Sequence, residues 1–180
     1  MSSKPGQALG ALARLYLDVA LWRRGPADVP AVPLLLWFTV AAYAGVTAGL
    51  SAALGLRGAW PQQLAADVAF NLAWVWLLLW ATRRPERFLQ TAIAVFAVQL
   101  VLAPLMVGVV ALAPQPETAV DGGQALAVIA NLAVSLWIVY ATARIMRPAF
   151  EWPLAACVPL SFFLFLAEQL LLQALFEPGH

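Results

Sequence analysis

Six polar side chains interrupt the long apolar stretches of this sequence, and they are the residues that could do chemistry. They are two carboxylates, two asparagines and two glutamines: Asp67, Asn71, Gln99, Asn131, Glu168 and Gln169. Carboxyl and amide groups in apolar surroundings can form a shared site for a proton or an ion. The same groups can also hydrogen-bond neighbouring helices together, which is the more common use. The sequence leaves both interpretations open.

Other reactive residue types are scarce. Cys157 is the one cysteine and lies in an apolar run, which argues against an internal disulfide or a cysteine metal cluster. His180, the last residue, is the one histidine, so zinc, haem and histidine-based acid–base chemistry lack their usual ligands. We therefore expect no catalytic residue, no metal, no cofactor and no enzyme activity. A net charge of +1 also gives no basic field for nucleic acid.

The chain around these side chains is strongly apolar. Of its 180 residues, 63% are hydrophobic and 11% are charged, and the mean hydropathy is +0.84. Soluble domains carry about 25% charged residues, and apolar patches on soluble monomers stay small. The sequence therefore predicts an all-α polytopic membrane protein whose first partner is the lipid bilayer.

Five apolar segments are long enough to cross a bilayer, which takes about 20 residues. They are residues 33–54, 62–82, 88–112, 124–143 and 152–176. Pro104 lies in the third span and Pro159 in the fifth, so we expect both helices to bend. Residues 29–176 are thus predicted to form one five-helix transmembrane domain, with residues 177–180 as a short external tail.

Residues 1–28 form a basic lead before the first span. Its segment from Gln7 to Trp22 has a helical pattern with a narrow polar stripe of Gln7, Arg14 and Asp18. Such an amphipathic helix suits the membrane surface, although it could also be the first turns of a docked helix. Gly25-Pro26 is expected to end it.

Basic residues predict the orientation in the membrane. Nine of the ten lysines and arginines lie before the first span, between the second and third spans, or between the fourth and fifth spans. They are Lys4, Arg14, Arg23, Arg24, Arg83, Arg84, Arg87, Arg144 and Arg147. Only Arg57 falls on the other side. The positive-inside rule then predicts a cytoplasmic N-terminus and an external C-terminus. An Ala/Leu/Arg-rich, Lys-poor composition is typical of GC-rich bacteria, so we expect the inner membrane and a periplasmic C-terminus.

The polar side chains fall at one depth of this arrangement. At about 1.5 Å per residue, Asp67, Asn131 and Glu168 each lie roughly 10 Å below the outer end of their spans. Three helices therefore contribute to one polar layer in the outer leaflet. Because no basic residue lies at that depth, we expect at least one of the two carboxyls to be protonated.

Small residues recur every fourth position in the first span: Ala41, Gly45, Gly49 and Ala53. This spacing places them on one helix face, where another backbone can approach closely. We name these four residues the small-residue seam and expect it to face a helix of this chain or of a partner.

Two segments resemble each other within the chain. The two asparagines, Asn71 and Asn131, each begin an Asn-Leu-Ala triplet, and an Ala-Thr pair and an Arg-Pro pair follow each of them. Spans two and three and spans four and five are therefore predicted to be copies of one hairpin, related by an axis along the membrane normal.

The span layout of residues 30–176, after a basic lead, resembles that of the Yip1-type small membrane proteins. The segment Asp18 to Pro26 is similar to a short Asp-Leu-Tyr-Gly-Pro stretch of that family, except that Leu15-Tyr16 here precedes Asp18. The resemblance implies a membrane-trafficking scaffold and carries no site residue across.

These observations support three functions to different degrees. A non-enzymatic scaffold or accessory subunit of a larger membrane complex is favoured, because the loops are short and the small-residue seam offers a docking face. Its partner would be an integral membrane protein or a second copy of the chain. The alternative is a small transporter or channel, which the repeat and the polar layer indicate. A membrane-embedded enzyme has the least support, since an Asp/Glu pair alone does not define a reaction.

Overall fold

The computed structural model describes residues 5–55, 60–111 and 122–176, and all the regular elements in these ranges are helical. In chain order they are α1 (Pro5–Ala20), η1 (Pro26–Asp28), α2 (Pro33–Ala53), α3 (Trp60–Ala81), η2 (Pro85–Arg87), α4 (Phe88–Ala111), α5 (Gly122–Phe150) and α6 (Leu154–Phe176). Five helices, α2 to α6, are long and apolar enough to cross a membrane. The chain is therefore a polytopic all-α membrane protein, as its composition predicts.

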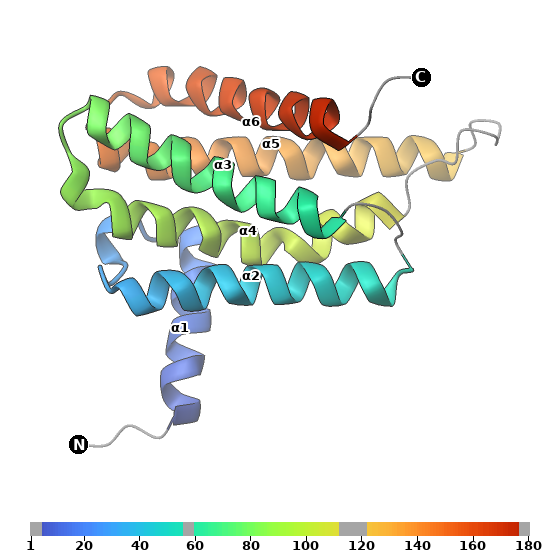
Figure 1. The fold of residues 1–180 in the computed structure, drawn as a ribbon, viewed down its shortest axis with the longest axis horizontal. Helices are drawn as coiled ribbons and strands as arrows, with labels where there is room; N and C mark the ends of the chain where they lie inside the picture. Colours follow the sequence, from blue (N-terminus) through green and yellow to red (C-terminus); the bar gives the residue numbers. More distant parts are fainter. Residues whose placement is uncertain (1–4, 56–59, 112–121, 177–180) are drawn as a thin grey trace.

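The helix α4 is the centre of the bundle. It packs against α2, α5, α3 and α1, and the five long helices run side by side (Figure 1). The segment Thr91–Val98 is buried on every side, and its alanines let the neighbouring helices approach. A helix that is apolar around its whole circumference is expected in such an interior position. By contrast, only 11% of the α6 span is buried, against 61% of the α4 span.

The first helix, α1, lies across the long helices rather than along them (Figure 1). One face of its second half is buried, with Tyr16 and Val19 packed into the core. Thr39 donates a hydrogen bond of 2.7 Å to Leu35 O, so its oxygen is left to accept from the Tyr16 hydroxyl. This crosswise direction is the one expected of a helix at the membrane surface.

The end of α1 differs from the prediction. The helix ends at Ala20 rather than Trp22, and Trp22 has a left-handed backbone with φ of 63°. The N–H of Arg23 then bonds the carbonyl of Asp18 at 2.8 Å, which closes the helix before Gly25-Pro26. Trp22 leaves the helix to pack against Tyr140 and Trp137, with ring centroids 4.8 Å and 5.6 Å away.

Most span boundaries agree closely with the prediction, but α5 does not. It continues past Ala143, where the fourth span was predicted to end, through Pro148 to Phe150. Ile145, Met146 and Ala149 are fully buried on this extension. Their burial explains why the helix continues through a proline. The helices α4 and α6 also continue through Pro104 and Pro159.

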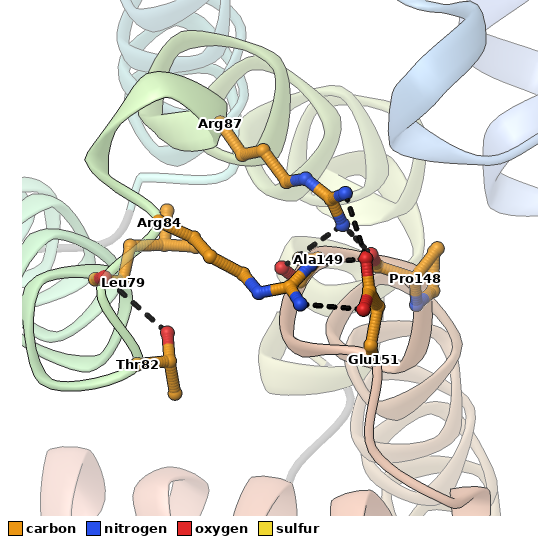
Figure 2. A network of polar contacts seen from close by, with 7 residues as sticks. All are labelled: Leu79, Thr82, Arg84, Arg87, Pro148, Ala149 and Glu151. Carbon is orange, nitrogen blue, oxygen red and sulfur yellow. Dashed lines mark hydrogen bonds and ion pairs between the residues drawn. The ribbon is translucent and has the colours of Figure 1, made fainter.

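The connections α1–α2, α3–α4 and α5–α6 all lie at one end of the bundle (Figure 1). This end carries Arg23, Arg24, Arg83, Arg84, Arg87, Arg144 and Arg147, and we call it the arginine-rich end. Figure 2 shows how Glu151, just after α5, joins the two hairpins there: it forms ion pairs with Arg84 and Arg87. Arg87 also donates to the carbonyl oxygen of Pro148.

Candidate functional site

A hydrogen-bonded cluster joins three helices in the half of the bundle away from the arginine-rich end. Its members are Tyr43 on α2, Asp67 and Asn71 on α3, and Glu168 on α6. The Asn71 amide nitrogen lies 2.8 Å from Asp67 Oδ1 and 3.1 Å from Glu168 Oε1. The Tyr43 hydroxyl donates to Asp67 Oδ2 at 2.8 Å. One neutral amide thus bridges the two carboxyl groups.

A fifth side chain fixes the orientation of that amide. The indole N–H of Trp74 donates to Asn71 Oδ1 at 3.1 Å. An indole nitrogen can only donate, so the oxygen of the amide must face Trp74 and its nitrogen must face the carboxyls. Asp67, Asn71 and Trp74 are all buried. Trp74 was not among the polar residues singled out in the sequence.

The cluster lies beside a cavity of about 440 Å³ between the helices. Each of the five long helices contributes to its wall, through residues that include Tyr43, Asp67, Gln99, Ile138 and Glu168. Ligand pockets are typically about 300 to 1,000 Å³ with a mostly apolar lining and a few convergent polar groups. The cavity has this character, and its lining contains neither lysine nor arginine among the described residues.

Two further polar atoms of the cavity wall are buried without a hydrogen-bond partner among the described residues. They are the Thr47 hydroxyl oxygen on α2 and the Gln99 side-chain carbonyl oxygen on α4. Buried polar atoms are normally hydrogen-bonded, so one without a partner indicates that a ligand or water binds there. The Gln99 oxygen can only accept and the Thr47 hydroxyl can accept as well as donate, so the wall offers oxygens to a positively charged or proton-donating group.

The structure brings together five of the six polar residues singled out in the sequence. Asp67, Asn71 and Glu168 form the cluster, while Gln99 and Gln169 line the cavity beside it. Asn131 is apart from them on an exposed stretch of α5, next to Ile129 and Leu132, which are exposed as well. Asn71 and Asn131 therefore occupy different surroundings, although they are equivalent in the predicted repeat. The repeat itself stays a prediction.

The sequence analysis missed the contribution of α2. Thr39, Tyr43, Thr47 and Ser51 recur every fourth residue, so one face of α2 presents hydroxyl groups to the bundle. The small-residue seam has the same spacing but is displaced by two positions, which is about 200° around a helix. Because the hydroxyl face points inward, the seam must point outward.

The exposure of the seam agrees with this geometry. Ala41, Gly45, Gly49 and Ala53 are all exposed. A Cβ atom placed on Gly45 or Gly49 would meet no atom of the described chain within 4 Å. Gly45 and Gly49 therefore do not pack closely against a helix within the described part of this chain, and the expectation of a helix partner there concerns another chain.

No family model, curated protein or solved structure matches the chain. The resemblance to Yip1-type proteins stays an expectation from the span layout, and the function must be argued from the site.

Proposed function

We propose that this protein is a small transporter that takes a proton or a small cation into the outer-leaflet cavity through Asp67 and Glu168. The observation that carries the proposal is the Asn71 bridge, which holds carboxyls from α3 and α6 beside one cavity. A buried carboxylate needs a compensating positive charge or a proton. The described cavity wall supplies no basic side chain. The negative charge of the carboxyls is therefore best compensated by a cation or proton from outside.

The position of the cavity fits this role. Residues of α2, α3, α4 and α6 that line it lie toward the end of the bundle opposite the arginine-rich end. If the arginine-rich end is cytoplasmic, as the positive-inside rule predicts, the cavity belongs to the outer leaflet. In a bacterial inner membrane, which the composition favours, it would receive its ion from the periplasm.

Flux measurements on reconstituted protein test this function. Liposomes containing the wild-type chain and a trapped dye sensitive to protons, Na⁺ or K⁺ are given an inward gradient of the same ion. We expect the wild type to carry one of these ions and Glu168→Gln to abolish the flux, because an amide cannot ionise. Leu170→Ala changes an exposed residue that does not line the cavity and leaves both carboxyls, so it should retain flux. Equal flux from wild type and Glu168→Gln, or no flux of any of the three ions, would reject the proposal.

A scaffold or accessory-subunit function is a second candidate, and the exposed small-residue seam favours it. Small residues let helix backbones approach in lipid, where van der Waals packing drives association. The occupant would be a second copy or another integral membrane protein. Mass spectrometry of the complex extracted in mild detergent distinguishes these cases. A chain that is extracted only as a monomer would count against this function.

A further inference from the structure

A second pocket lies at the arginine-rich end, outside the cavity described above. It has a volume of about 300 Å³ and lies between the segment after α1 and the last turns of α5. Four arginines line it: Arg23 and Arg24 from the first segment, and Arg144 and Arg147 from α5. Its one lining carboxylate is Asp28, whose Oδ2 already accepts the Gly25 N–H at 2.9 Å.

The charges of this pocket are only partly balanced. Asp18 pairs with Arg24 at 3.4 Å and approaches Arg23 at 4.0 Å. Within the described chain, Arg144 and Arg147 form no ion pair with a carboxylate, although they lie three positions apart on one helix face. Arg84 and Arg87 at the same end do have such a partner, Glu151. The pocket thus concentrates positive charge that the described residues neutralise only in part.

Aromatic residues place the pocket at the level of lipid headgroups. Trp22 lines it and packs against Tyr140 and Trp137, and the Trp137 indole donates to Ala20 O at 3.1 Å. Tryptophan and tyrosine gather where the bilayer meets water, because their rings are apolar and carry one polar group. This aromatic group also holds α1 against α5, which keeps the two arginine pairs facing one pocket.

We propose that this pocket binds a phosphate ester, supplied by the headgroup of an anionic phospholipid. Guanidinium groups bond phosphate oxygens through paired N–H donors, and two arginine pairs on opposite walls can hold one phosphate from both sides. Basic pockets between transmembrane helices on the cytoplasmic side bind anionic headgroups in this way. A soluble phosphate ester has the same chemistry, so the source is decided by experiment. The inference does not depend on the transport proposal.

The test titrates the purified full chain, in neutral detergent, with three probes. They are phosphatidylglycerol, phosphatidylcholine and glycerol 3-phosphate, with binding followed by native mass spectrometry and by Trp fluorescence. We expect phosphatidylglycerol to bind in preference to phosphatidylcholine. The double variant Arg144→Gln/Arg147→Gln should bind it about thirtyfold more weakly. Glycerol 3-phosphate that binds as tightly as phosphatidylglycerol would support the phosphate site and identify a soluble ligand as its source.

Two further variants separate binding from folding. Arg83→Gln removes an exposed arginine of the same end that does not line the pocket, so it should bind like wild type. Asp28→Asn removes the one lining carboxylate and can still accept the Gly25 N–H, so it should bind about fivefold more tightly. A gain cannot come from misfolding. Unchanged binding in the double variant, equal loss in Arg83→Gln, or no gain in Asp28→Asn would each overturn the proposal.

Discussion

The Asn71 amide reaches Glu168 across the interface of α3 and α6, with Nδ2 3.1 Å from Oε1. The same nitrogen lies 2.8 Å from Asp67 Oδ1, and Trp74 holds the amide oxygen on its other side. One amide therefore links the two carboxyls, while Tyr43 holds the other oxygen of Asp67. This relationship makes Asn71 the residue whose loss should disturb the site most directly.

Replacing Asn71 with leucine should destabilise the fold by about 1–3 kcal/mol, because the carboxyl oxygens and the Trp74 N–H lose buried partners. The free energy of unfolding can be measured in detergent by reversible denaturation. Asn131→Leu is the matched control, since Asn131 lies exposed among apolar side chains on α5. It should be neutral or slightly stabilising. If both variants lose equal stability, the bridge has no special role.

Glu151 should make the arginine-rich end sensitive to acid. Hydrogen bonds from Arg84 and then Arg87 lower the pKa of Glu151 from its ordinary 4.5 to about 2. A carboxyl whose pKa is lower in the folded than in the unfolded protein stabilises the fold at pH values above its ordinary pKa. This contribution is lost as the pH falls from 4.5 to about 2. The wild type should therefore be more stable than Glu151→Gln above pH 4.5, and the difference should vanish near pH 2.

Thermal unfolding of both proteins in detergent at several pH values measures this difference. Because Glu151 is exposed, added salt should reduce it as well. A difference that is constant across the pH range would show that the substitution acts through something other than the ion pairs with Arg84 and Arg87.

Gly49→Leu should disrupt assembly without unfolding the single chain. A Cβ atom at this position would meet nothing within 4 Å in the described structure, but a leucine side chain would hold a partner helix away. Size-exclusion chromatography with light scattering should show a smaller particle for the variant than for wild type. Ala133→Leu, an equally exposed substitution on α5, should leave the particle size unchanged. Identical particles for Gly49→Leu and wild type would show that the seam is not a contact surface.

How far the sequence predicts this structure depends on the kind of feature. Apolar length predicted the ends of α2 to within one residue, because the cost of polar backbone in lipid limits a span from both sides. It could not predict the end of α5, where packing of Ile145 and Met146 extends the helix beyond the apolar run. For the same reason, the proline at Pro148 did not mark a boundary.

The candidate site shows the same division. The depth of Asp67 and Glu168 followed from counting residues along a helix, and the structure places both beside one cavity. Depth alone says nothing about the rotation of a helix, so it could not separate Asn71, which faces inward, from Asn131, which faces outward. The sequence could have predicted which face of α2 points inward, because its hydroxyl face and its small-residue seam are on opposite sides of the helix.

Reporter fusions test the predicted orientation. In the sequence, nine of the ten lysines and arginines belong to the lead or to the connections predicted to be cytoplasmic, and only Arg57 belongs to a connection predicted to be external. Basic segments are retained in the cytoplasm, so the arginine-rich end should be cytoplasmic. Reporters fused after residue 120 and after residue 176 should both be external, whereas one fused after residue 84 should be cytoplasmic. Cytoplasmic signals at both residue 84 and residue 176 would contradict five spans, because three crossings separate these two positions. If all three reporters were inverted, the arginine-rich pocket would face outward and the carboxyl cavity would open toward the cytoplasm, which would reverse the direction of the proposed uptake.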